Sequence, residues 1–487
     1  MGDKPPLAVQ RQRFRLDADP TRVINRLFIP DGQGRTQAVF DRVLALPSDE
    51  VNSVLARVMD DFAPRHKNIT ADFSAHFEDA ARQIHWSGHL SPPRRQLIGA
   101  YFTCEYSLES VALFNPSIVP HPDQSGLPDD ACRFVMSLRA CGEGHISSIE
   151  FRSGVIDARN AITLDPVTRF AATSKPAAEK RYEKHPFVLK MNEMGAFNPV
   201  VEWVLRDLGD FFKLEDLERV VAQHRDDRGD HTYVHQSLDT MLWLARSNYH
   251  LTFPQDSDLS ERVIYPVTEN ESRGIEDARF VRFVNDDGTV EYFATYSAYN
   301  GVRVLPQFIE TPDFRHFKII TLNGRYAKHK GVAIFPRKID GYYMMVSRVD
   351  GESIYLMPSD NRHFWNQAEK LQPPTRSWEF MRMGNCGSPV ETDEGWLLLT
   401  HGIGPMRQYC MGAMLLDLHD PSKVIGQLDV PLLVPHADER DGYVPNVVYS
   451  CGAMIHNQTL IIPYAMSDSA VGLATVPLQD LLTHLAA

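Results

Sequence analysis

The segment at residues 274–279, which reads GIEDAR, concentrates the clearest chemistry of this chain because it places two carboxylates and a guanidinium close together. A neighbouring negative charge or burial raises the proton affinity of a carboxyl group, and a neutral carboxyl can serve as a general acid. An isolated aspartate more often caps the backbone of a turn. The interpretation of Asp277 therefore depends on what the rest of the chain places around it.

Motifs for several other common reactions are missing from the sequence. It has no GxxxxGK[ST] phosphate loop, no GxGxxG between a strand and a helix, no HExxH pair and no GxSxG elbow. Its six cysteines contain no CxxC pair, and we expect free thiols in a reducing compartment. We therefore expect neither a metal nor an organic cofactor.

The balance of charge narrows the class of partner. The 487 residues carry 50 basic and 63 acidic side chains, a formal net charge of −13. Nucleic acids and anionic membrane surfaces bind basic protein surfaces, so we expect neither as a partner of this acidic chain. The first residues lack the apolar stretch of a secretory signal, and no apolar run approaches the roughly 20 residues of a membrane span. We expect a cytoplasmic protein that acts on a small soluble substrate, and a homo-oligomer is compatible with the sequence.

Two kinds of pattern divide the chain. In residues 1–110, apolar residues recur at helical spacing near 47–59, 69–84 and 93–108, which predicts a helical N-terminal extension or cap. In residues 111–487, short runs rich in aromatic and β-branched residues begin near turn-forming pairs, which predicts many short strands.

The β-rich runs recur along this second part. They lie near residues 134, 292, 343, 396 and 461, at intervals of roughly 50 residues apart from one longer gap, and this is a plausible blade length. The long gap contains a helical pattern, so we predict a helical insertion at about 180–230. Five recurrences favour an all-β fold, a five-bladed β-propeller, with the helical extension before it.

Several of these segments resemble, in the same order, motifs of glycoside hydrolase family 130, which comprises β-mannoside phosphorylases and β-mannosidases. GIEDAR is similar to the family's GxEDPR, YSAYNG at 296–301 to TYTAYDG, and HKGVAIFP at 329–336 to NKDxxLFP. SR at 347–348 stands where the family has HRP, and further matches follow in the C-terminal part. The resemblance spans roughly residues 113–484. It implies a five-bladed propeller with the site in its central pocket.

The resemblance implies that the chain cleaves β-mannosidic bonds in short manno-oligosaccharides with inversion at the anomeric carbon. Asp277 matches the family's proton donor, and we expect Glu276, other carboxylates or burial to raise its proton affinity. An inverting enzyme holds its second catalytic group about 6.5–9.5 Å away, across the sugar. Family positions that contact the sugar correspond to Asn115, Arg139, Glu276, Arg279, Tyr299, His401 and Asp468.

The sugar-binding assignments have structural alternatives. Asn115 precedes a proline and can form a turn, Asp468 can cap a turn, and Arg279 can form an internal ion pair. Tyr299 and Trp365 are candidates to stack on sugar faces, although aromatic side chains more often lie in the core. The three-dimensional arrangement must decide which of these side chains reach the pocket.

The nucleophile separates two reactions. In the phosphorylases of the family, inorganic phosphate attacks the sugar and needs several cations, for which arginine is favoured. The resemblance places these contacts at Lys330, Arg348 and His401. A further family lysine, in the motif PxIKT, is replaced here by Glu391 in SPVET.

The substitution at Glu391 favours water as the nucleophile. A carboxylate repels a phosphate dianion by about 1 kcal/mol per charge pair at roughly 4 Å in water, and it can act as a general base. The sequence therefore favours an inverting hydrolase, a β-mannosidase with Asp277 as acid and Glu391 as base, and β-1,2-linked mannosides are candidate substrates. If Glu391 lies at an exposed strand edge instead, the chain is a β-mannoside phosphorylase that uses inorganic phosphate and produces mannose 1-phosphate. A carbohydrate-binding propeller without catalysis is the third alternative.

Overall fold

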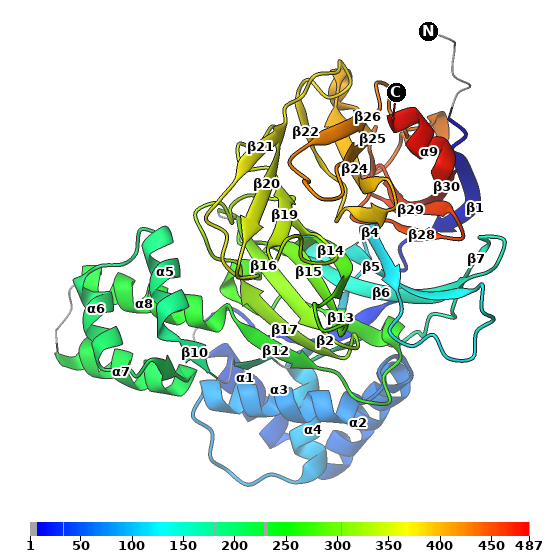
Figure 1. The fold of residues 1–487 in the computed structure, drawn as a ribbon. Helices are drawn as coiled ribbons and strands as arrows, with labels where there is room; N and C mark the ends of the chain where they lie inside the picture. The colour runs from blue at the N-terminus through cyan, green and yellow to red at the C-terminus, as the bar shows by residue number, and fades with distance from the viewer. Residues whose placement is uncertain are drawn as a thin grey trace.

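Five mainly antiparallel sheets of four or more strands are the main feature of the part of the chain that the structure describes (Figure 1). The structure is a computed structural model. It describes residues 7–486 apart from 33, 175, 179–180, 228–231 and 303. The sheets follow one another along the chain, and we number them one to five in that order.

Some neighbouring strands in the first two sheets are not consecutive in the chain. From one edge to the other, sheet one contains β4 (Ala112–Pro120), β5 (Cys132–Cys141), β6 (Ser147–Ile156), β13 (Arg262–Ile264) and β8 (Ala172–Thr173), with β7 (Ile162–Leu164) paired to β6. Sheet two, again from one edge to the other, contains β14 (Ile275–Val284), β15 (Val290–Tyr299), β16 (Val304–Thr311), β17 (His316–Thr321), β12 (Tyr249–Thr252) and β9 (Ala177–Ala178). Sheet three contains β18 (Ala333–Ile334), β19 (Tyr343–Ser347), β20 (Ile354–Ser359) and β21 (Glu369–Gln372).

The last two sheets come from the C-terminal part and from one N-terminal strand. Sheet four contains β22 (Arg382–Asn385), β24 (Gly395–Ile403), β25 (Tyr409–Leu416) and β26 (Val424–Gln427), with β23 (Val390–Thr392) paired to β24. Sheet five contains β27 (Val448–Tyr449), β29 (Thr459–Met466), β30 (Ala470–Pro477) and β1 (Gln10–Leu16), with β28 (Met454–His456) paired to β29.

The strand sequences explain why these sheets are buried. β24 reads GWLLLTHGI and is buried along its whole length, which is the pattern of a strand covered on both faces. β15 reads VEYFATYSAY, and its aromatic residues suit a pleated, packed surface. A tight turn joins β14 to β15, where Gly288 takes a positive φ of 81° that favours glycine. Local sequence therefore accounts for both the strands and the turns between them.

The sheets pack against one another in a cyclic order. Buried apolar side chains join sheet one to sheet two, two to three, three to four, and four to five. A further cluster joins sheet five back to sheet one, through residues such as Ile461 on β29 and Phe134 on β5. We call this arrangement the sheet ring. β4, β14, β18, β22 and β27 each form one edge of their sheets.

Sheet five takes an outer strand from the N-terminal part of the chain. β1 pairs antiparallel with β30, and Figure 1 shows the two strands side by side. The paired residues Gln10 and Thr475 are 465 positions apart. Residues 1–110 thus differ from the expected helical extension, because they also contain β1 and β2 (Val23–Leu27), which pairs with β3 (Thr103–Ser107). Local patterns do not reveal pairings between such distant segments.

The helices lie outside the sheet ring. The N-terminal group contains α1 (Arg35–Ala45), α2 (Ser48–Phe62), α3 (Ile69–Gln83) and α4 (Pro92–Tyr101). The insertion contains α5 (Lys184–Glu193), α6 (Pro199–Arg206), α7 (Leu214–Asp227) and α8 (Thr232–Arg246), has its own apolar core, and includes the short pair β10 (Tyr182–Glu183) and β11 (Phe211–Phe212). α9 (Leu478–Leu485) follows β30. The prediction of a mainly β chain with N-terminal helices and a helical insertion is confirmed, although the insertion extends to Arg246.

No helix within the described ranges is long and apolar enough to cross a membrane.

Candidate active site

Asp277 lies on β14 at a point where the strand is bulged. The pairing of β14 with β15 shifts register between Glu276 and Arg279, and Asp277 takes a positive φ of 57°. Asn115 on β4 has the same features, with a register shift around it and a φ of 49°. Bulges re-aim side chains next to active sites. In this chain they bring Nδ2 of Asn115 to 2.6 Å from Oδ1 of Asp277, to which it donates a hydrogen bond.

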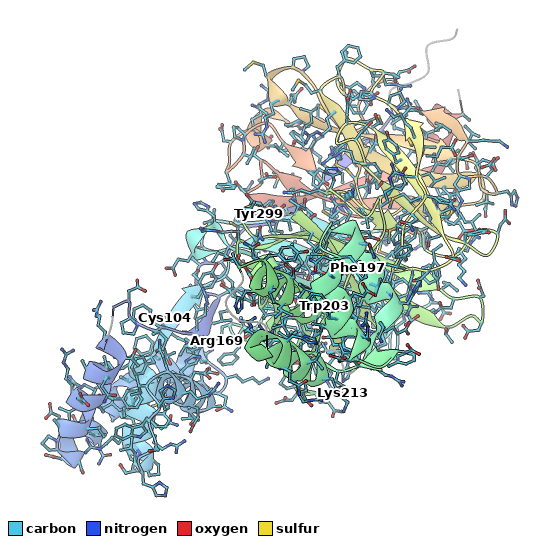
Figure 2. The ribbon with its side chains drawn as sticks, turned by 90° about the vertical axis from the view of Figure 1, so that its left-hand side faces the viewer. Cys104, Arg169, Phe197, Trp203, Lys213 and Tyr299 are labelled. Carbon is cyan, nitrogen blue, oxygen red and sulfur yellow. The ribbon has the colours of Figure 1, made fainter. Side chains whose placement is uncertain are left out.

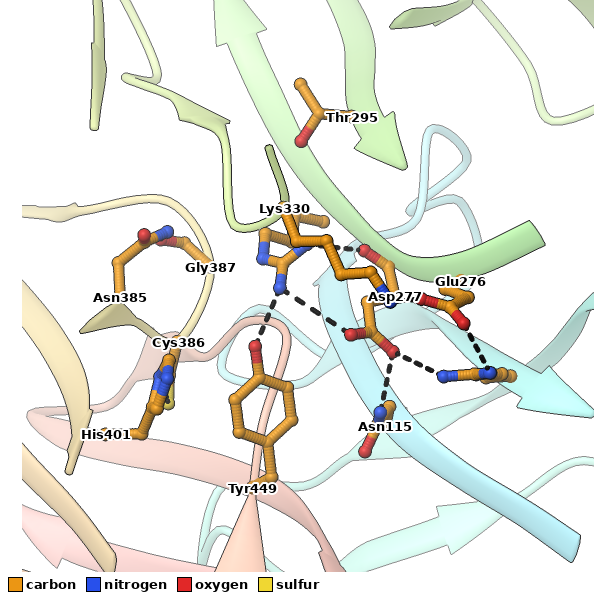
Figure 3. A network of polar contacts seen from close by, with 12 residues as sticks. Asn115, Glu276, Asp277, Thr295, Lys330, Asn385, Cys386, Gly387, His401 and Tyr449 are labelled. Atoms are coloured by element: carbon orange, nitrogen blue, oxygen red, sulfur yellow. Dashed lines mark hydrogen bonds and ion pairs between the residues drawn. The ribbon is translucent and has the colours of Figure 1, made fainter. Parts of the chain in front are cut away.

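Cationic side chains surround the adjacent carboxylates of Glu276 and Asp277 (Figure 3). Arg139 on β5 lies with Nη1 3.4 Å from Oδ1 of Asp277 and Nη2 3.1 Å from Oε1 of Glu276. Lys330, in the loop before β18, donates to the other Glu276 oxygen. Arg279 donates from Nη1 to the Asp277 carbonyl at 2.8 Å, and its Nη2 lies 3.9 Å from Oδ2 of Asp277. The two carboxylates are therefore held by ion pairs from both sides.

Arg279 also connects this centre to sheet five. Its Nη2 lies 2.7 Å from the hydroxyl of Tyr449 on β27, and Figure 3 shows this ring below the guanidinium. Arg279 is buried, so its contacts are shielded from solvent. Because Asn115 belongs to sheet one and Asp277 to sheet two, the centre lies where sheets one, two and five meet.

The electrostatics of Asp277 differ from the expectation. Burial favours the neutral carboxyl, but Arg139, Arg279 and weaker contacts favour the carboxylate and hold the pKa of Asp277 below its ordinary value. We expected Glu276 and burial to raise that pKa, and this prediction is wrong because it left out the cations. Asp277 is thus a carboxylate at neutral pH in this arrangement. Acid catalysis requires a bound ligand to weaken these contacts.

Asp468 is a carboxyl group near Asp277 that favours its neutral form. It lies in the turn between β29 and β30 and takes a positive φ of 50°. Burial and the negative charge of Asp277 raise the pKa of Asp468 to about 7, although Arg139 opposes the shift. Below about pH 7, Asp468 and Asp277 share one proton, and the titration of each depends on the charge of the other.

A second group of basic side chains comes from sheets three and four. Arg348 follows β19, and its Nη1 lies 3.3 Å from Nε2 of His401 on β24. Burial, Arg348 and Arg279 hold the pKa of His401 well below its usual range, so the imidazole is neutral. Gly384 permits the close approach, since a Cβ there would lie 2.6 Å from Cε1 of His401 and 3.3 Å from Nη1 of Arg348. Because Arg279 acts on both Asp277 and His401, the two groups adjoin one another.

Several buried polar atoms in this region have no hydrogen-bond partner within the described part of the chain. They are Nε of Arg279, Nε of Arg348 and Oδ1 of Asn385. Buried polar groups are normally paired, so such atoms mark a place where a ligand can bind. Guanidinium donors suit bidentate contact with an oxyanion such as phosphate. The described residues contain no group of three or more His, Cys, Asp or Glu side chains that could hold a metal ion.

Most of the residues expected from the sequence lie in or next to this site, namely Asn115, Arg139, Glu276, Asp277, Arg279, Lys330, Arg348, His401 and Asp468. Tyr299 lies at its margin, with Nζ of Lys330 5.8 Å from the centre of its ring. Trp365 lies elsewhere. It is fully buried in the cluster between sheets two and three, and its Nε1 donates to the Arg362 carbonyl, so the prediction that it stacks on a sugar is wrong.

Glu391 is also outside the site, on β23. Its side chain is 41% exposed and pairs with Arg337, whose Nη2 lies 2.6 Å from Oε1. Glu391 pairs across the hairpin with Trp396, five residues before His401 on β24, which corresponds to about 17 Å along a strand. The prediction that Glu391 faces Asp277 as a general base is therefore wrong. Glu391 instead has the exposed position at a strand edge that was the alternative.

Other residues of the site were not expected from the sequence. Tyr449 and Asn385 lie in segments that resemble the family, but a motif match gives no sign of which side chains turn inward. The sequence does give an indication for Gly384, because a glycine within a strand often marks the close approach of another group.

Comparison with known proteins assigns the chain to a family. The family model for glycoside hydrolase family 130, described as beta-1,4-mannooligosaccharide phosphorylase, matches residues 185–486. The chain belongs to glycoside hydrolase family 130. The resemblance found in the motifs is thereby confirmed, and the chain is a carbohydrate-active enzyme of that family.

Two proteins that are similar in sequence are named as phosphorylases. A 1,2-beta-oligomannan phosphorylase from Thermoanaerobacter sp. (strain X514) is 33% identical over 46% of this chain and 75% of its own length. A beta-1,2-mannobiose phosphorylase from Listeria innocua is 31% identical over 50% of this chain and 67% of its own length. A solved structure of beta-1,2-mannobiose phosphorylase from Listeria innocua with beta-1,2-mannobiose is 21% identical, covers 78% of this chain and 93% of that chain, and has a TM-score of 0.46.

Proposed function

We propose that this chain is an inverting β-mannoside phosphorylase, which uses inorganic phosphate to release mannose 1-phosphate from a short manno-oligosaccharide. The observation that carries the proposal is the group of basic side chains beside Asp277. Arg279, Lys330 and Arg348 supply cations, and His401 supplies a neutral imidazole. The two similar proteins named above, both phosphorylases of β-1,2-linked mannosides, support the same reaction. The hydrolase favoured by the sequence loses its main support, because Glu391 lies outside the site.

The proposed reaction has simple stoichiometry. The bond between the anomeric carbon and the glycosidic oxygen breaks, and a phosphate oxygen bonds to that carbon from the opposite face. A β-mannoside therefore gives the α-anomer of mannose 1-phosphate. The leaving oxygen takes one proton, which we assign to Asp277, and hydrogen phosphate releases one proton when it forms the ester, so the protons balance. Phosphate neutralises part of the charge of Arg279 and Lys330, and this raises the proton affinity of Asp277 when it is needed.

We also propose that the sheet ring is a five-bladed β-propeller. The cyclic packing of the sheets and the pairing of β1 with β30 support this architecture. The site is compatible with it, since its side chains come from or next to edge strands of several sheets, including β4, β14, β22 and β27. A cytoplasmic location, a homo-oligomeric state and the absence of any cofactor other than phosphate as co-substrate stay predictions from the sequence.

A direct assay tests the proposed reaction. The purified protein is incubated with β-1,2- and β-1,4-linked mannobiose, with and without phosphate, and both products are quantified. We expect mannose 1-phosphate that depends on phosphate, and Asp277→Asn should lower kcat by about 10²- to 10⁴-fold. Free mannose formed at the same rate without phosphate would refute the phosphorylase and restore the hydrolase. Binding of mannosides without turnover would favour a carbohydrate-binding role.

A further inference from the structure

The helical insertion forms hollows next to the segment that carries Asp277. One hollow of about 270 Å³ lies between Trp243 and Asp239 on α8, Glu269, and the loop residues Asn300 and Val302. A second, of about 540 Å³, shares Trp243, Asp239 and Glu269 and continues along α8. Trp243 therefore contributes to both hollows. The α8 helix that carries it packs on the other side into the apolar core of the insertion.

The side chains around Trp243 suit a neutral sugar. A partly exposed indole offers a flat apolar face on which the C–H groups of a pyranose can stack, and its N–H is a donor. The carboxylates of Asp239 and Glu269 are acceptors for hydroxyl groups. Asp239 pairs with Arg225, whose Nη2 lies 2.5 Å from Oδ1, and Arg246 lines the second hollow, so the lining has mixed charge and does not select for an anion. The combination of one aromatic face with a few polar groups is typical of a small-molecule site.

The hollows are connected to the active site through the backbone. The loop with Asn300 and Val302 follows Tyr299 directly, and Tyr299 exchanges backbone hydrogen bonds with Arg273 and Gly274. Lys330, which contacts Glu276, lies 5.8 Å from the Tyr299 ring. Three residues of extended chain span at most about 10 Å, so Val302 lies within a short oligosaccharide's reach of Tyr299.

Figure 2 supports this route along the surface. It shows Tyr299 beside the helices of the insertion, with Phe197 in the loop between α5 and α6 and Trp203 on α6. Glu269 lies only five residues before Gly274, on the same segment that leads into β14. Because Asn300 and Val302 line the same hollow as Trp243, a sugar chain that leaves the centre past Tyr299 meets α8 next.

We propose that Trp243, with Asp239 and Glu269, forms a distal binding site for the leaving-group end of a manno-oligosaccharide. The inference rests on the proposed function, in which the terminal mannose is held beside Asp277 and the rest of the sugar chain extends outward. The site makes the insertion a determinant of substrate length. Disaccharides end before it, and longer β-linked manno-oligosaccharides reach it.

Rates measured with substrates of different length test the distal site. Wild type, Trp243→Ala and Glu269→Gln are compared on β-mannobiose and β-mannotetraose of both linkages at saturating phosphate. We expect Trp243→Ala to lower kcat/KM for the tetrasaccharide by about two- to tenfold, the value of one aromatic contact, and to leave the disaccharide within about twofold. Glu269→Gln should show the same selectivity with a smaller effect. Because Glu269 is exposed, this variant reports on the site even if Trp243→Ala does not fold.

The matched control is Tyr233→Ala, which removes another exposed aromatic ring from α8 that lines neither hollow. It should affect neither substrate. Equal losses on both lengths, or no loss on the tetrasaccharide for either variant, would overturn the distal site. If wild type turns over no β-mannoside, the proposed function fails, and calorimetric titration with mannotetraose still tests the site. Weaker binding by Trp243→Ala would then support it, and equal binding would overturn it.

Discussion

Replacing Arg348 with alanine removes the guanidinium that lies beside His401 in the proposed phosphate site. Within the described residues its Nε has no partner, and its Nη1 has a long contact of 3.3 Å with the His401 ring. At least two of its donors are therefore available to an oxyanion. Arg348 is partly buried, which makes these donors stronger than they would be in water.

The expected magnitude follows from those two donors. A hydrogen bond to a charged group contributes about 1.5–3 kcal/mol, so two such bonds at the lower limit contribute about 3 kcal/mol. At about 1.4 kcal/mol per tenfold, Arg348→Ala should raise the KM for phosphate roughly 100-fold. Arg348→Lys keeps a positive charge but not the planar fork of donors, and we expect an increase of roughly tenfold.

Initial rates with varied phosphate at saturating β-mannobiose measure this effect. Arg337→Ala is the control, because that guanidinium is partly exposed and pairs with Glu391 rather than with the site. It should leave the KM for phosphate unchanged. If Arg348→Ala changes that KM by less than about threefold, the assignment of a phosphate site to this basic group is wrong.

Three further changes probe other parts of the site. Glu391→Gln should leave kcat within about twofold, because Glu391 lies outside the site in an exposed ion pair with Arg337; a tenfold loss would restore Glu391 as a base. Asp468 has a pKa of about 7 in the folded chain against 3.8 ordinarily, so its contribution to stability declines as the pH rises from about 4 to 7. The melting temperature of Asp468→Asn should therefore rise relative to wild type across that interval, and a difference independent of pH would contradict the shifted pKa. Gly384→Ala would place a Cβ 2.6 Å from the His401 ring, and overpacking of about 1–3 kcal/mol should lower the melting temperature and raise the KM for phosphate; an unchanged KM would show that His401 does not position phosphate.

The sequence predicts much of the site because the relevant residues lie in short motifs with a fixed order. Asp277, Lys330, Arg348 and His401 come from separate motifs, and the structure brings all of them to one region. Motif order is informative because each motif supplies a side chain from a different strand or loop around the site. The strand pattern likewise predicts a mainly β chain, since aromatic runs alternate with turn residues.

Other features depend on contacts that no local pattern contains. The role of Glu391 as a base follows from matching one short segment to a family motif. Such a match does not include the pairing of β23 with β24, which decides whether the side chain lies in the pocket or at an exposed strand edge. The lowered pKa of Asp277 requires Arg139, which lies 138 positions away. Tyr449 reaches Arg279 only because β27 and β14 are neighbours in space. Distances of this kind follow from the packing of whole sheets.

The pairing of β1 with β30 has a consequence for how the chain folds. β1 is synthesised early and β30 late, so β1 has no partner strand until nearly all of the described chain has been made. The apolar clusters between sheets four and five and between five and one must likewise wait for the last strands. Contacts between such distant segments slow folding and leave strand edges exposed in the meantime. A break in β1 should therefore impair assembly of the entire ring, although Asp277 and its partners lie far from it in sequence.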